Sequence, residues 1–172
     1  MRKISAGKYL AIVAALLTIL GSYLFAMYEG LAPDSVASAI GLFQGITTTF
    51  ENVSSYSAAL GGEWVAYTLI ILMIIFAISG IFQLIGIKSR AVILIFSLFP
   101  LGIGIIVVLD MLMSLDTAQI NYMLILLTEK PIIEGAIPFY LDLGGVGLGS
   151  YLVIAGGFIG IISGILPREE YY

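Results

Sequence analysis

The sequence contains no cysteine and no histidine among its 172 residues. Without cysteine there is no disulfide, no thiolate metal site and no cysteine nucleophile. Without histidine the chain lacks the usual ligand of haem, copper and zinc and the usual general base near neutral pH. We therefore expect no cofactor, no bound metal and no catalytic residue, and we predict that the protein is not an enzyme.

Charge is also scarce. Charged residues make up 10% of the chain and hydrophobic residues 60%, and the mean hydropathy is +1.13. Soluble domains average about 25% charged residues, so the composition indicates an integral membrane protein with a single domain over residues 1–172. The partners expected of such a chain are membrane lipids and other membrane subunits or a second copy, not nucleic acid.

Four apolar runs are long enough to cross a bilayer, which requires about 20 residues per helix. Backbone groups within lipid must be satisfied inside their own segment, so we predict helices. The first run is longer than the apolar core of a cleaved signal peptide, and we expect it to be retained. The sequence thus predicts an all-α membrane protein with four transmembrane helices in an antiparallel bundle, at about 8–28, 64–87, 91–113 and 143–166.

The basic residues predict an orientation. Six of the seven fall on one side of these spans, and Lys130 is the exception. By the positive-inside rule both termini are cytoplasmic and the protein is a multi-pass plasma-membrane protein. The acidic residues predicted outside are Glu29, Asp34, Glu51, Glu63, Asp116, Glu129, Glu134 and Asp142.

Two external loops, about 29–63 and 114–142, separate the spans. In the first, Val36, Ala39, Ile40 and Phe43 follow the spacing of a short amphipathic helix. In the second, the run "INYMLILL" is too short to span a membrane. It is expected to extend the third span, to form a strand or to be buried in a partner.

Glycines recur at helical spacing in the fourth span. At 100° per residue, five glycines share one face of about 100°, which offers a surface for close helix contact. The first span carries a similar stripe of small residues, so we favour a contact within the chain over a contact with a partner or a lipid tail. The helix-packing residues predicted are Gly145, Gly149, Gly156, Gly160 and Gly164 with Ala11, Ala15, Thr18 and Ser22.

Three further features have both a structural and a functional interpretation. Asp110 is an acid within a span, and it is either a residue that reaches water near the outer end or an intramembrane polar site. Pro100 is expected to kink the third span. Asn52 begins the sequon "NVS" and is a candidate glycosylation site, while Trp64, Tyr28 and Tyr140 are typical of an aromatic belt at the membrane surface.

The topology of four spans with a longer first external loop resembles the claudin and tetraspan arrangement, although the paired external cysteines of those families are missing here. We predict a non-catalytic accessory or structural subunit of a larger membrane or cell-surface complex. It would pack through its small-residue helix faces and through the apolar stretches 36–43 and 122–127. The alternative is a small oligomeric channel or transporter. The isoleucine-rich composition is compatible with an archaeal cell envelope.

Overall fold

The computed structural model describes residues 5–30, 34–133 and 137–166. Within these ranges, four helices are long and apolar enough to cross a membrane. They are α1 (Ala6–Ile19), continued by a π-helical turn η1 (Leu20–Leu24), α4 (Glu63–Ile85), α5 (Arg90–Met113) and α7 (Leu148–Ile165). The prediction of four packed apolar helices is confirmed.

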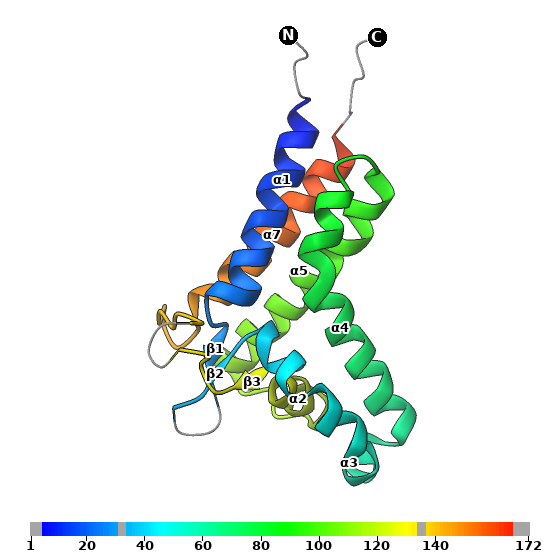
Figure 1. Cartoon of the computed structure of the whole chain (residues 1–172), viewed down its shortest axis with the longest axis vertical. Helices are drawn as coiled ribbons and strands as arrows, with labels where there is room; N and C mark the ends of the chain where they lie inside the picture. Colours follow the sequence, from blue (N-terminus) through cyan, green and yellow to red (C-terminus); the bar gives the residue numbers. More distant parts are fainter. Residues whose placement is uncertain (1–4, 31–33, 134–136, 167–172) are drawn as a thin grey trace.

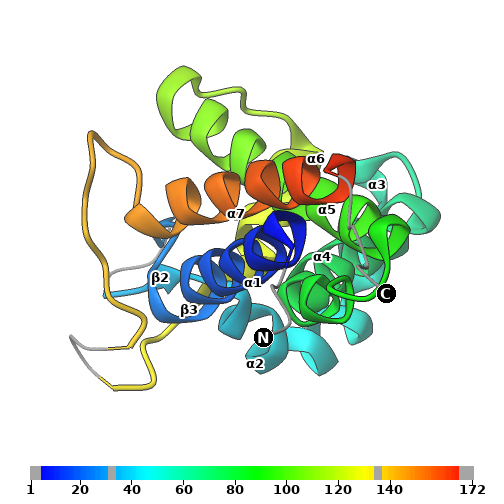
Figure 2. The same ribbon diagram turned by 90° about the horizontal axis from the view of Figure 1, so that it is seen from above.

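The four long helices form a bundle in which each one packs against two others (Figure 1). α7 packs against α1 and α5, and α4 packs against the same two helices. Figure 2, which looks along the bundle, shows α7 between α1 and α5. α5 continues through Pro100 as one helix, and Pro100 is buried.

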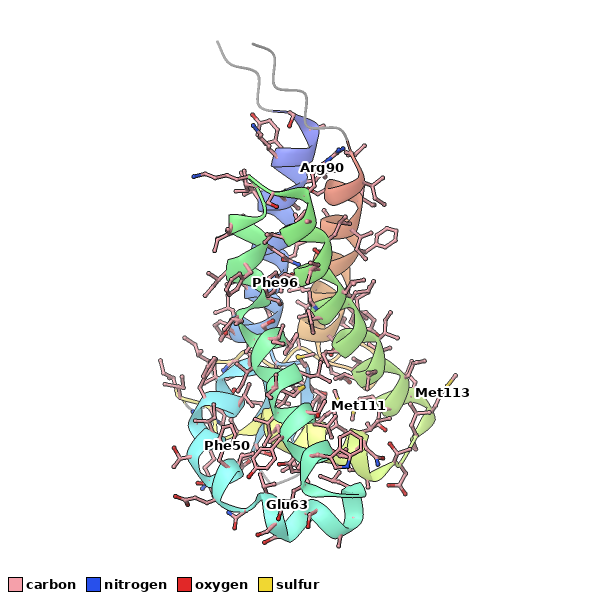
Figure 3. The ribbon with its side chains drawn as sticks, turned by 90° about the vertical axis from the view of Figure 1, so that its right-hand side faces the viewer. Phe50, Glu63, Arg90, Phe96, Met111 and Met113 are labelled. Atoms are coloured by element: carbon pink, nitrogen blue, oxygen red, sulfur yellow. The ribbon has the colours of Figure 1, made fainter. Side chains whose placement is uncertain are left out.

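The bundle has two distinct ends. The start of α1 lies beside the end of α7, since the Ser163 hydroxyl donates to the carbonyl oxygen of Gly7 at 2.6 Å. At the same end, the Arg90 guanidinium donates to the carbonyl oxygens of Ile165 and Leu166. These carbonyls have no partner within α7, and a cation at a helix C-terminus also interacts favourably with the helix dipole. Figure 3 shows Arg90 near this end and Glu63 at the opposite one.

The segments between the spans fold into what we call the loop lobe, residues 25–62 and 114–147. It contains three helices, α2 (Ala39–Glu51), α3 (Val53–Leu60) and α6 (Ala118–Leu127). It also contains a small antiparallel sheet in the order β1 (Tyr28–Glu29), β2 (Val36–Ala37) and β3 (Thr128–Glu129). The description "all-α" therefore misses a sheet that joins both loops.

The apolar stretches of the two loops are buried against each other. Ala37, Ala39 and Leu42 from the first loop belong to the same core cluster as five residues of the second, together with side chains of α4 and α5. These five are Tyr122, Met123, Leu124, Leu126 and Leu127. Gly41 allows the backbone of α2 to approach Leu127, because an added Cβ would collide with the carbonyl group of that residue. The run "INYMLILL" belongs to the separate helix α6. Most of the two stretches is thus covered within the chain, while Phe43 and Ile125 remain exposed.

Candidate functional site

The glycine face of α7 is inside the bundle. Gly149, Gly156, Gly160 and Gly164 are buried. A Cβ added at Gly156 would lie 2.8 Å from both the carbonyl oxygen of Ala14 and the amide nitrogen of Thr18. Contacts this short with backbone cannot be relieved by a side-chain movement, so the absent side chain is what lets α7 touch α1. The facing residues of α1 and η1 are buried as well, namely Ala11, Ala14, Ala15, Thr18 and Ser22.

The same helix makes a second close contact that the sequence reasoning missed. A Cβ at Gly157 would lie 2.6 Å from the amide nitrogen of Leu101 and 2.8 Å from the carbonyl oxygen of Ser97, both on α5. On α5, Gly104 faces Ile154 in the same way. The adjacent glycines Gly156 and Gly157 thus allow close contact with two different helices, α1 and α5. The doublet "GG" in the sequence could have predicted this second contact.

Gly145 does not belong to this face. It precedes α7, has a φ of +86° and would have open space around an added Cβ. Gly144 also has a positive φ, at +74°, and this left-handed backbone is favourable for glycine but not for a helix. The helix therefore begins five residues later than the predicted span, and Gly145 is a turn residue.

A few polar side chains are buried between the spans. The Gln83 side-chain amide donates to the Ser97 hydroxyl at 3.2 Å, which links α4 to α5 beside Gly160. The Ser150 hydroxyl donates to the carbonyl oxygen of Met27 at 2.9 Å. The side-chain oxygens of Thr18 and Ser22 are buried without a hydrogen-bond partner. Of these groups, Gln83 and Ser97 stabilise a helix contact directly, because buried hydroxyls and amides in lipid are stabilised by partners on neighbouring helices.

Asp110 lies in the last turn of α5 and is 8% exposed. One of its carboxylate oxygens, Oδ1, is buried without a hydrogen-bond partner. Its charge acts on Tyr28 of β1, whose pKa is raised above its ordinary value mainly by burial and further by Asp110. Tyr28 is fully buried and donates to the carbonyl oxygen of Leu124 at 2.5 Å. Its predicted place in an aromatic belt is therefore wrong.

A second buried carboxyl, Glu129, lies at the junction of the sheet and α2. Its Oε1 accepts a hydrogen bond from the Ser38 hydroxyl, and Ser38 caps α2 by accepting from the amide of Ile40 at 3.0 Å. Its other oxygen, Oε2, is buried without a partner. Burial raises the pKa of Glu129 to about 7, although the Ser38 hydrogen bond opposes this shift. This residue was predicted only as one of the external acids.

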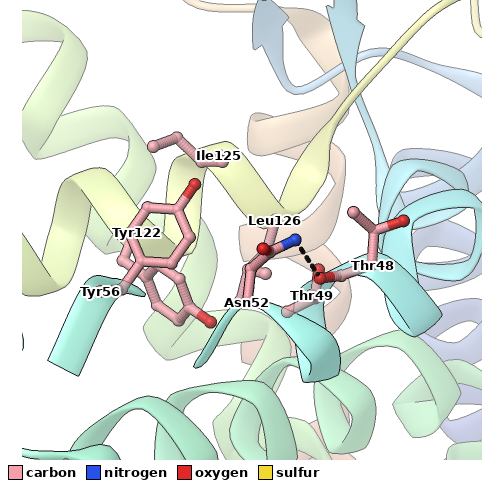
Figure 4. Close-up of a pocket in the computed structure, with 8 residues that line it drawn as sticks. Thr48, Thr49, Asn52, Tyr56, Tyr122, Ile125 and Leu126 are labelled. Atoms are coloured by element: carbon pink, nitrogen blue, oxygen red, sulfur yellow. Dashed lines mark hydrogen bonds between the residues drawn. The ribbon is translucent and has the colours of Figure 1, made fainter. Parts of the chain in front are cut away.

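Asn52 lies exposed at the junction between α2 and α3, and its side-chain amide donates to the carbonyl oxygen of Thr48 at 2.8 Å. Beside it is a partly open cavity of about 210 Å³ in the loop lobe (Figure 4). The Tyr122 hydroxyl at this cavity is buried without a partner. The cavity is lined by Gly45, Thr48, Thr49, Asn52, Tyr56, Tyr122, Ile125 and Leu126.

We predict that Gly156→Ala lowers the thermal unfolding midpoint of the protein in mild detergent. The added methyl group meets backbone of α1, and overpacking of this kind costs about 1–3 kcal/mol. The matched control is Gly102→Ala in α5, where an added Cβ meets nothing within 4 Å. Because alanine favours helix over glycine, the control is expected to unfold at the same temperature or higher. Equal losses in the two variants would contradict the close contact.

We predict that stability decreases as the pH rises through the titration of Glu129. The folded-state pKa of about 7 is above the ordinary value of 4.5, so the folded protein retains this proton to higher pH than the unfolded chain does. The free energy of unfolding then declines between about pH 4.5 and pH 7 and levels off above. Thermal unfolding in detergent from pH 4.5 to 8.5 measures this decline.

Glu129→Gln is expected to remove most of this pH dependence and to be more stable than the wild type at pH 8. The control Glu51→Gln changes an exposed acid and is expected to keep the wild-type slope. A wild-type slope in the Glu129→Gln variant would show that another group is responsible.

Comparison with known proteins finds no family model that matches the chain, and no curated protein or solved structure matches it significantly. The function is therefore inferred from the chain's own residues. The described residues contain no group of three or more acidic side chains arranged to hold a metal ion.

Proposed function

We propose that this integral membrane protein is a non-catalytic accessory or structural subunit of a larger membrane or cell-surface complex. The glycine face of α7 and most of the apolar loop stretches are already covered within the chain, so neither supplies the main surface for a partner. A partner has to bind what remains exposed. The proposal therefore depends on the chemistry of the uncovered part of the loop lobe and of the adjoining end of α4.

One exposed surface there has the composition of a protein interface. Phe50, Trp64 and Tyr67 form what we call the aromatic ridge, and Trp64 is 71% exposed. The rings of Phe50 and Tyr67 are stacked with centroids 6.3 Å apart. Aromatic residues are enriched in protein interfaces and dominate their binding energy. This ridge is the observation that carries the proposal.

The charges around the ridge favour a protein over acyl chains as its partner. Glu51 and Glu63 are exposed beside the ridge, and exposed carboxylates are costly in contact with hydrocarbon. The other exposed acids of the loop lobe include Glu29, Asp34, Asp116 and Asp142, and Lys130 is exposed among them. A partner with a basic rim around an apolar centre would match both the aromatic rings and the surrounding charge.

The alternative function, a small oligomeric channel or transporter, is favoured by Asp110. An ionisable residue within a span is a functional hypothesis by default, and Oδ1 of Asp110 is buried without a hydrogen-bond partner. Several copies that bring this residue to a shared axis would create a cation-attracting ring. The small-residue contacts leave little room for such a path inside a single bundle.

We expect mild-detergent purification from the native membrane, followed by native mass spectrometry, to find the chain bound to different polypeptides. Trp64→Ala combined with Tyr67→Ala should lose these polypeptides while keeping the wild-type unfolding temperature. The matched control Ile81→Ala with Ile95→Ala changes exposed apolar residues of α4 and α5, and it should keep them. A homo-oligomer that passes cations into liposomes would establish the alternative. A monomer that binds no other polypeptide and passes no cations would contradict both functions.

We further propose that the start of α1 and the end of α7 face the cytoplasm, as the positive-inside rule indicates for Lys8, Lys88 and Arg90. The absence of cysteine makes this directly measurable. Ser55→Cys in α3 should react with a membrane-impermeant maleimide on intact cells, whereas Lys88→Cys should react only after permeabilisation. The reverse pattern would invert the topology. In the proposed orientation Asn52 is external, so its sequon is available for glycosylation where the host has the machinery.

A further inference from the structure

A second exposed apolar surface lies away from the aromatic ridge. Between β3 and α7 the structure describes residues 130–133 and 137–147, which together we call the arm. Ile132 is 60% exposed and Leu141 is 51% exposed. The other exposed apolar side chains of the arm are Ile133, Phe139 and Leu143. Single exposed apolar residues are ordinary, but a group of five on one segment marks an interaction surface.

Backbone hydrogen bonds attach the arm to the end of the first span. The amide of Phe139 donates to the carbonyl oxygen of Leu24, the last residue of η1, at 2.7 Å. The amide of Ala26 donates back to the carbonyl oxygen of Phe139 at 2.8 Å. The amide of Gly147 donates to the carbonyl oxygen of Met27 at 2.9 Å, immediately before α7 begins. This part of the arm is thus held at one end beside the last residue of η1 and at the other end immediately before the first turn of α7.

The figures show the direction of the arm. In Figure 1 it lies at the level where η1 ends and α7 begins, above the lower ends of α3 and α4. In the view along the bundle, the coloured yellow and orange parts of the arm lie to the side of the bundle, beyond its edge (Figure 2). A segment that leaves the ends of two spans sideways runs along the membrane surface.

The polar groups of the arm suit the boundary between lipid headgroups and acyl chains. The Tyr151 hydroxyl on α7 donates to the carbonyl oxygen of Leu143 at 3.2 Å, and tyrosines are enriched at this depth. Lys130 and Asp142 are exposed on the arm, and they need access to water. Irregular backbone exposed to lipid does not occur deeper in the hydrocarbon, so the backbone of an arm that contacts the bilayer is restricted to its surface.

The apolar surface of the arm is continuous with the lipid-facing surface of the bundle. Leu16 and Leu20 are exposed on the first span, and Leu20 is one turn before the residue that bonds Phe139. Tyr151 is exposed on α7, one turn after it begins. Because these helices span the membrane, lipid acyl chains surround this part of their surface. That continuity distinguishes the arm from the aromatic ridge, which is flanked by acids.

We propose that the arm is an interfacial lipid anchor. The side chains of Ile132, Ile133, Phe139, Leu141 and Leu143 enter the acyl-chain boundary of the leaflet next to the loop lobe, while Lys130 and Asp142 remain among the headgroups. Amphipathic segments of this kind bury their apolar side about 5–10 Å into that boundary. The anchor fixes the height and rotation of the loop lobe above the membrane, independently of any protein partner.

The experiment uses tryptophan fluorescence in a background without the single native tryptophan, Trp64→Phe. Ile133→Trp and Leu141→Trp place the probe on the arm, and Ser55→Trp places it on exposed α3 as the matched control. Each purified full-length protein is reconstituted into phosphatidylcholine vesicles whose acyl chains carry bromine either near the headgroup or near the chain end. Thermal unfolding of each variant confirms that it remains folded.

The arm probes are expected to emit at shorter wavelength than the control and to be quenched roughly twofold or more strongly. Bromine near the headgroup should quench them more than bromine near the chain end. Emission and quenching equal to those of the position 55 control would show that the arm is in water and would overturn the proposal. A short-wavelength emission without quenching would show that a second copy covers the arm, and it would overturn the proposal as well.

Discussion

The bundle depends on the backbone of α7 touching two neighbours at once. Gly156 brings α7 against α1, and Gly157 brings it against α5, at distances that leave no room for a Cβ. Within lipid, apolar side chains gain nothing by leaving one hydrocarbon environment for another. Contact therefore depends on dispersion between closely packed atoms and on a few hydrogen bonds, such as the one between Gln83 and Ser97. The helix-propensity cost of glycine is offset by this close approach.

The loop lobe follows a different rule because it borders water. Its core is made by burying the apolar side of α6 against α2 and the lower part of α4, as in a soluble domain. The lobe also buries the carboxyl group of Glu129, and burial makes the charged form of a carboxyl group unfavourable. Glu129 is held by the N-cap of α2, and burial raises its pKa even though the Ser38 hydroxyl donates to it. Lobe and bundle share one continuous core cluster.

Much of the architecture could be predicted from the sequence because hydrophobic length is a strong local signal. The four spans followed from runs of about 20 apolar residues, and the small-residue faces followed from helical periodicity. The ends of the spans were less predictable. Gly144 and Gly145 shorten the fourth span through a left-handed backbone, and Tyr28 leaves the first span to join a strand.

What could not be predicted depends on contacts between distant segments. The three-stranded sheet pairs Val36 with Glu129, residues from different loops, through strands of two residues each. Strands this short carry no period-two signal. The burial of "INYMLILL" inside the chain, the second neighbour of α7 and the hydrogen bond between Ser38 and Glu129 have the same origin. For the candidate sites, residue type alone identified Asp110 and Asn52, but only the fold locates their neighbours.

The place of α7 in the bundle has a consequence for how the protein is made. Helices emerge from the ribosome in chain order, and α7 is the last of the four spans. Until it is in place, α1 and α5 lack the neighbour that covers Thr18 on one side and Ser97 on the other, although Gln83 of α4 already donates to the Ser97 hydroxyl. The ring α1, α4, α5 and α7 closes only when the final span arrives, and Arg90 then bonds the end of that span. The last of the four spans in chain order is therefore the one that completes the bundle.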